Sequence, residues 1–98
     1  MNNIIESNEI YETGLKLYKI NNLNKAIYAF EHAIELNKNN DNAYNMLGKI
    51  YEIRKIYYIA EKYYINAINL KNKDARINLG RLYIKLNNHT SNDNFSKT

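Results

Sequence analysis

Three glycines limit most strongly how this 98-residue chain can fold. Gly14, Gly48 and Gly80 are spaced 34 and then 32 residues apart, and each lies in a stretch where apolar residues recur every three or four positions. That recurrence predicts amphipathic helices, and the chain contains no proline to break them. A glycine inside a helix costs about 1 kcal/mol relative to alanine. Three of them at nearly constant spacing predict an all-α protein of repeated units, in which a neighbouring helix approaches each glycine closely.

Other residues repeat in register with the glycines. Leu47-Gly48 matches Leu79-Gly80, and a tyrosine follows three residues later in both places, as Tyr51 and Tyr83. An order of alanine, aromatic residue and alanine also occurs twice, as Ala26, Phe30 and Ala33 and as Ala60, Tyr64 and Ala67. This pattern resembles the tetratricopeptide repeat (TPR). The resemblance implies antiparallel helix-turn-helix units stacked as a short right-handed α-solenoid, with these glycines, alanines and aromatic residues in its core.

The resemblance also divides the chain into segments. About two and a half units are present, so that the chain is a small protein of this family or a fragment of one. The expected segments are an N-terminal extension 1–6, a TPR-like domain 7–86 with units 7–40 and 41–72 and a single helix 73–86, and a polar tail 87–98 that is predicted to be disordered. Asp41 and Asp74 are predicted to cap the helices that follow them. The predicted helices are 7–20, 24–37, 41–54, 57–70 and 74–86.

The composition argues against several functional classes. The absence of cysteine excludes a disulfide framework and a thiolate metal site, and the two histidines and three separated glycines form neither a catalytic cluster nor a phosphate-binding loop. We therefore expect no enzymatic activity, no metal and no cofactor. No apolar stretch is long enough for a membrane span, and the polar start lacks the layout of a secretory signal, so we expect a cytoplasmic protein.

The resemblance implies a protein-binding adaptor or scaffold. The family typically binds a peptide segment of a partner in the concave groove that is lined by the first helix of each unit. The expected groove residues are Tyr11, Leu15, Tyr18, Asn45, Lys49, Glu52, Asn78, Arg81 and Lys85. Because three of them are cations, a ligand with acidic and apolar groups is expected. Nucleic-acid binding is disfavoured, because the net charge of +4 is dispersed along the chain and no module signature is present.

Two further alternatives concern the partner. Some family members clamp the C-terminal carboxylate of heat-shock chaperones, but of those clamp residues only Asn45 is present here, which disfavours this ligand. Self-association is the stronger alternative. Repeat proteins generally need about three units for stability, and here the second helix of the third unit is missing. The missing helix could come from another copy of the chain, which would then form a homo-oligomer.

Overall fold

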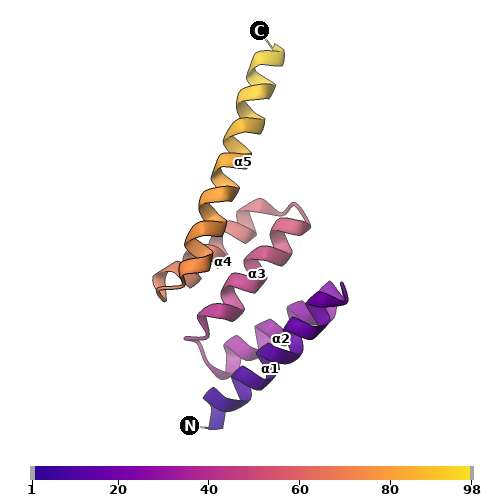
Figure 1. Cartoon of the computed structure of the whole chain (residues 1–98), viewed down its shortest axis with the longest axis vertical. Helices are drawn as coiled ribbons and strands as arrows, with labels where there is room; N and C mark the ends of the chain where they lie inside the picture. Colours follow the sequence, from indigo (N-terminus) through magenta and orange to yellow (C-terminus); the bar gives the residue numbers. More distant parts are fainter. Residues whose placement is uncertain (1, 98) are drawn as a thin grey trace.

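Five consecutive α-helices make up the protein (Figure 1), which is represented by a computed structural model describing residues 2–97. Each helix packs against the next one along the chain, and α5 also contacts α3. α1 and α2 form the N-terminal end, and α5 extends beyond the other helices (Figure 1). The all-helical repeat architecture is therefore confirmed. The helices are α1 (Asn2–Lys19), α2 (Leu23–Leu36), α3 (Asp41–Ile53), α4 (Tyr57–Asn69) and α5 (Lys73–Lys97).

The first two glycines lie where paired helices meet, as predicted. A Cβ atom added at Gly14 would lie 2.6 Å from the Phe30 ring, and one added at Gly48 would lie 2.5 Å from the Tyr64 ring. Both rings are buried, with exposed fractions of 0% and 1%. α1 therefore packs against α2, and α3 against α4, around a glycine that leaves room for an aromatic ring. The alanines flanking the two rings, Ala26, Ala33, Ala60 and Ala67, are fully buried.

The third glycine differs from the other two. A Cβ atom added at Gly80 would meet no atom within 4 Å, and Gly80 itself is exposed. Tyr83 is 46% exposed, whereas its counterpart Tyr51 is partly buried. The prediction that Gly80 and Tyr83 belong to the core is therefore wrong. The reason is that no helix after α5 covers this side within residues 2–97.

Two asparagines connect the units and cap the helices that follow them. The Asn40 amide nitrogen donates to the Ser7 hydroxyl at 2.8 Å, and Ser7 donates to the Ala33 carbonyl at 2.6 Å. At the same time the Asn40 side-chain oxygen accepts from the backbone N–H of Ala43 at 3.2 Å. Asn40 is therefore the N-cap of α3 and also ties that helix to α1.

Asn72 repeats this arrangement one unit later. Its amide nitrogen donates to the side chains of Asp41 at 2.8 Å and Asn42 at 3.0 Å, and its oxygen accepts from the backbone N–H of Ala75 at 2.7 Å. The predicted capping roles of Asp41 and Asp74 are therefore wrong. Both aspartates lie inside the first turn, where their charge favours the helix N-terminus.

Both ends of the chain are more helical than predicted. α1 already begins at Asn2, because residues 2–6 contain no residue that breaks a helix. α5 continues to Lys97 instead of ending near Leu86, since neither glycine nor proline follows in residues 87–97. The predicted disorder of the tail stays a prediction, and residues 1 and 98 lie outside the described part. The division into extension, domain and tail stays a prediction.

In the turns that follow α1, α3 and α4, one residue has its backbone in the left-handed region. Asn21, Lys55 and Lys71 have φ angles of 63°, 63° and 72°. In each case the next backbone N–H closes the turn on a carbonyl five residues earlier, as Asn22 does on Leu17 at 2.8 Å. Glycine is the usual residue in this conformation, because a side chain strains it. All three residues lie in the gaps between the predicted helices, although two of the three left-handed positions carry lysine.

Replacing Lys55 or Lys71 by glycine is expected to stabilise the protein. Relief of left-handed strain exceeds the extra flexibility of glycine in the unfolded chain, so the free energy of unfolding rises by about 0.5–1 kcal/mol. Urea unfolding followed by circular dichroism measures the change. Asn21→Gly is the matched control with a smaller gain, because asparagine tolerates the left-handed region better. A loss of stability in both lysine variants would contradict this assignment.

Candidate functional site

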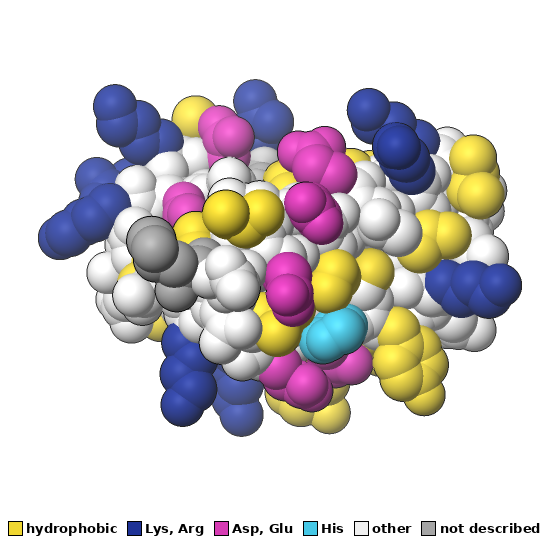
Figure 2. All heavy atoms as spheres, turned by 90° about the horizontal axis from the view of Figure 1, so that it is seen from below, with side chains coloured by type: hydrophobic (Ala, Val, Ile, Leu, Met, Phe, Trp, Pro, Cys, Tyr) yellow, Lys and Arg dark blue, Asp and Glu magenta, His cyan; other side chains and the backbone are white. Residues whose placement is uncertain are grey.

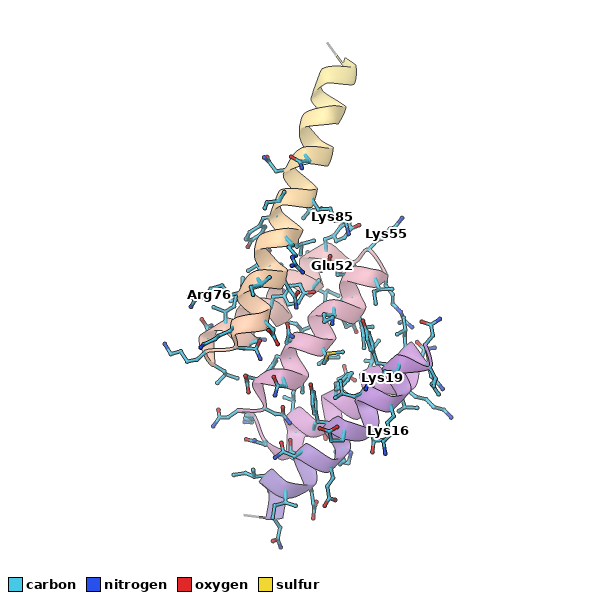
Figure 3. All side chains as sticks on the ribbon, viewed as in Figure 1. Lys16, Lys19, Glu52, Lys55, Arg76 and Lys85 are labelled. Atoms are coloured by element: carbon cyan, nitrogen blue, oxygen red, sulfur yellow. The ribbon has the colours of Figure 1, made fainter. Side chains whose placement is uncertain are left out.

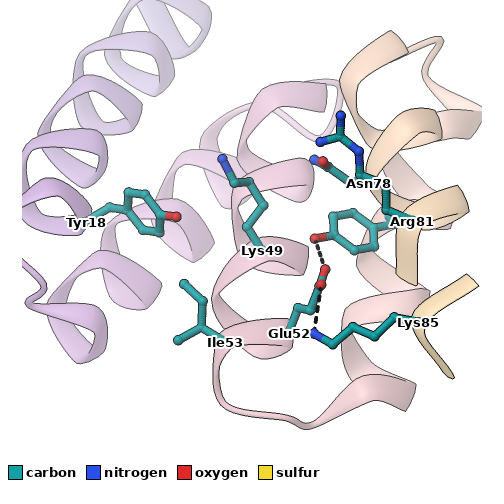
Figure 4. A pocket seen from close by; sticks show the side chains of 8 residues that line it. Tyr18, Lys49, Glu52, Ile53, Asn78, Arg81 and Lys85 are labelled. Carbon is teal, nitrogen blue, oxygen red and sulfur yellow. Dashed lines mark hydrogen bonds and ion pairs between the residues drawn. The ribbon is translucent and has the colours of Figure 1, made fainter. Parts of the chain in front are cut away.

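The inner faces of α1, α3 and α5 border two neighbouring open cavities, which we call the groove. The first has a volume of about 280 Å³ and is shown in Figure 4. It is lined by Tyr18, Lys49, Glu52, Ile53, Tyr64, Asn78, Arg81 and Lys85. The second has a volume of about 360 Å³ and is lined by Tyr11, Asn42, Asn45, Met46, Lys49, Asp74, Ile77, Asn78 and Arg81. Lys49, Asn78 and Arg81 border both cavities, so the two adjoin one another.

Eight of the nine residues predicted for the groove line one or both cavities. Leu15 lines neither, since its partly buried side chain packs against the core between α1 and α2. Tyr11 and Tyr18 also pack partly against that core, and the Tyr11 ring lies 5.5 Å from the ring of Phe30. The structure thus brings the predicted residues together from three helices. Their binding of a partner stays a prediction.

Glu52 is held in place from two sides. It accepts a hydrogen bond from the Tyr64 hydroxyl at 2.8 Å, and the Lys85 ammonium lies 3.5 Å from its other oxygen (Figure 4). Burial, followed by the hydrogen bond to Glu52, raises the pKa of Tyr64, so this hydroxyl remains a donor at neutral pH. Figure 3 shows Glu52 and Lys85 pointing toward one another between α3 and α5. The charge of Lys85 is therefore partly compensated inside the protein.

Among the described residues, Lys49 and Arg81 are the groove cations with no carboxylate within 4.0 Å. In the part of the chain that the structure describes, the Lys85–Glu52 pair is the one ion pair within 4.0 Å. The Lys49 ammonium lies 5.6 Å from the centre of the Tyr18 ring, in the geometry of a cation–π contact. Arg81 is exposed on α5 and faces the same cavities. Two positive charges from neighbouring helices are thus available to a ligand.

An asparagine pair joins α3 and α5 beneath these cations. The Asn78 amide nitrogen donates to the side-chain oxygen of Asn45 at 3.0 Å, and Asn45 is only 7% exposed. A buried polar pair with satisfied hydrogen bonds fixes the positions of the two helices more specifically than apolar packing does. The spacing between Lys49 on α3 and Arg81 on α5 is therefore set by the fold.

Six lining residues are not among the nine expected groove residues: Asn42, Met46, Ile53, Tyr64, Asp74 and Ile77. Tyr64 was predicted as core, and it is both buried and part of the lining. Its sequence signal is its hydroxyl, because a buried tyrosine usually needs a hydrogen-bond partner.

The pKa of Tyr11 is raised mainly by burial and then by the carboxylates of Glu12, Asp41 and Asp74. The groove therefore carries negative as well as positive groups.

The described residues offer little for metal chemistry. No group of three or more histidine, cysteine, aspartate or glutamate side chains in this part of the chain could hold a metal ion. His32 is exposed on α2 beside Glu31 and Glu35 and lines neither cavity of the groove. Likewise, none of the described helices is long and apolar enough to cross a membrane.

A family model described as TPR repeat matches residues 14–52, which reach from Gly14 through α2 to the end of the groove face of α3. The all-helical fold and this match together indicate a helical-repeat protein. The five helices are consistent with a small TPR-like repeat protein. Repeats of this family are non-enzymatic and generally mediate protein–protein interactions. A comparison with curated proteins finds no match.

Proposed function

We propose that this protein is a binding module that holds a peptide segment of a partner protein in the groove between α1, α3 and α5. The observation that carries the proposal is the pair of uncompensated cations Lys49 and Arg81, which face both cavities from neighbouring helices. Solvated cationic side chains are common on any protein surface, but Lys49 and Arg81 border a concave cavity that Tyr18 and Ile53 also line. A module that binds such a segment could act as an adaptor or scaffold.

The lining predicts the chemistry of the bound segment. One or two carboxylates of the ligand would pair with Lys49 and Arg81, and an apolar side chain would contact Tyr18 and Ile53, which is 52% exposed. Glu52 and Asp74 at the sides of the groove would repel a ligand with many acidic groups. The groove therefore favours a segment with few carboxylates next to apolar residues.

Selection of peptides from a random displayed library, with the purified chain as bait, tests this proposal. We expect enriched sequences that combine aspartate or glutamate with an aromatic or aliphatic neighbour, because complementary charge gives specificity to an otherwise apolar contact. A parallel selection on the Lys49→Glu/Arg81→Glu variant serves as the control. Enrichment of neutral or basic peptides by the wild-type chain would contradict the proposed ligand chemistry.

A further inference from the structure

One side of α5 carries a stripe of exposed residues that no part of the described chain covers. Its members recur at three- and four-residue spacing, so they share one face of the helix. The stripe consists of Lys73, Arg76, Ile77, Gly80, Tyr83, Ile84 and Asn87, all of them exposed. Ile77 and Ile84 expose 54% and 63% of their surface, and Arg76 points away from α3 (Figure 3). At equivalent places in α1 and α3, Gly14 and Gly48 lie under the rings of Phe30 and Tyr64.

The opposite end of the molecule is built differently. In α3, the side chains packed toward the preceding unit are apolar and buried, among them Ala43 and Leu47. The residues 34 positions earlier in α1 are Glu9 and Thr13, and both are exposed. Acidic side chains are prominent on this end of the molecule (Figure 2). At these two positions α1 therefore ends the stack with polar side chains, although Ile4 and Ile5 near its start are exposed, whereas the stripe on α5 leaves Ile77 and Ile84 open.

The stripe is symmetric about Gly80. Positions three, four and seven residues before this glycine belong to it, and so do positions three, four and seven residues after it. The positions three residues before and four residues after Gly80 lie on the same side of the stripe. If a second α5 lies antiparallel with a two-fold axis at Gly80, Ile77 of one copy therefore faces Ile84 of the other. The absence of a side chain at the crossing point lets the two backbones come close.

The charges of the stripe also suit an antiparallel copy. Lys73 and Arg76 precede Gly80 in the sequence, and the stripe residues that follow Gly80 carry no charge. In the antiparallel arrangement each basic half faces an uncharged half, so like charges stay apart. Arg76 would face the copy's Tyr83, whose hydroxyl donates to the Glu61 carboxylate. Each arginine would thereby gain a carboxylate across the interface.

We propose that the partner of this stripe is a second copy of the chain, with the two α5 helices packed antiparallel around a two-fold axis at Gly80. The isoleucines form the apolar part of the contact, and Arg76 with Glu61 forms its charged edge. Ile77 also borders the second cavity of the groove, whereas Asn78, Arg81 and Lys85 lie on another face of α5. The dimer therefore leaves the first cavity open, and peptide binding there and dimerisation can fail independently of one another.

Cysteine cross-linking of the full chain tests the two-fold axis. The natural chain has no cysteine, and Gly80→Cys adds a side chain where no atom lies within 4 Å, so the fold should accept it. Two cysteines can form a disulfide when their Cα atoms lie within about 7 Å, which requires the glycine crossing. We expect Gly80→Cys to form a covalent dimer under mild oxidation much faster than Lys25→Cys, an exposed position on α2. Equal rates for the two variants would overturn the proposal.

Sedimentation over a range of concentrations tests the apolar contact. The wild-type chain should show a monomer–dimer equilibrium, and Ile84→Lys should weaken it at least about tenfold, because each dimer loses two apolar contacts and gains two charges. Ile20→Lys is the matched control, since Ile20 is 72% exposed at the end of α1, outside the stripe. A monomer at every concentration overturns the proposal, as does equal weakening by both variants. Open-ended growth of oligomers also overturns it, because it indicates head-to-tail stacking.

Discussion

Replacing Gly48 by leucine is expected to unfold the protein or nearly so. A Cβ atom at this position would lie 2.5 Å from the Tyr64 ring, and the ring is only 1% exposed. The ring cannot move aside easily, because its hydroxyl is bonded to Glu52 at 2.8 Å. Overpacking typically costs about 1–3 kcal/mol, and leucine adds three more carbon atoms in the same place. A domain of this size has little stability with which to offset that loss.

Alanine at two equivalent glycines makes the sharpest control. Gly48→Ala should lower the free energy of unfolding, because even one added carbon contacts the Tyr64 ring. Gly80→Ala should raise it by as much as about 1 kcal/mol, since alanine favours the helix and meets no atom within 4 Å. Urea unfolding at a concentration where the chain is monomeric gives both values. A Gly48→Leu variant that melts at the wild-type temperature would contradict the packing described for α3 and α4.

The glycines show how far the sequence predicts the fold. Spacing alone predicts a helix approaching each of them, and at Gly14 and Gly48 an aromatic ring fills the expected space. The prediction is wrong at Gly80 because the pattern identifies a position within a unit. Burial of that position depends on whether the unit has a second helix to cover it. Residues 2–97 contain no second helix for the third unit, and the exposure of Tyr83 agrees with this.

Helix ends were harder to predict than helix positions. Asparagine and aspartate cap helices about equally well, so local sequence does not choose between Asn40 and Asp41. The choice follows from a contact across 33 residues, in which Asn40 donates to the Ser7 hydroxyl. Such a contact exists only once α1 and α3 are packed. The extension of α5 to Lys97 is a different case, because no residue in that segment stops a helix.

The sequence predicts which residues line the groove, but it does not predict the contacts that these residues make with one another. The resemblance to the repeat family places Lys49 and Arg81 in the groove, and both line the cavities. The sequence did not reveal that Glu52 holds both Lys85 and the Tyr64 hydroxyl, because this depends on how α5 lies against α3. The pairing leaves Lys49 and Arg81 as the cations open to a ligand.

Reversing the charges of Lys49 and Arg81 is expected to abolish binding of an acidic peptide selected by the wild-type chain. Juxtaposed like charges cost several kcal/mol, so Lys49→Glu/Arg81→Glu should weaken affinity at least about a hundredfold. Wild-type binding should also weaken as added salt screens the contact. Lys85 is left unchanged, because a glutamate there would face Glu52 and could disturb the packing of α5 against α3.

The matched control is Lys25→Glu/Lys62→Glu. Both lysines are exposed, on α2 and α4, and neither lines the groove. This variant has the same change in net charge as the groove variant, so it separates a local contact from a general charge effect. Circular dichroism should show the helical content of the wild-type chain in both variants.

Calorimetric titration of one selected acidic peptide into the wild-type chain and these two double variants tests the groove most directly. The predicted result is binding by the wild-type chain and by Lys25→Glu/Lys62→Glu with similar affinity, and no measurable binding by Lys49→Glu/Arg81→Glu. Equal loss in both variants would mean that net charge alone attracts the peptide. Unchanged binding in both would place the peptide outside the groove, and either result would contradict the proposed function.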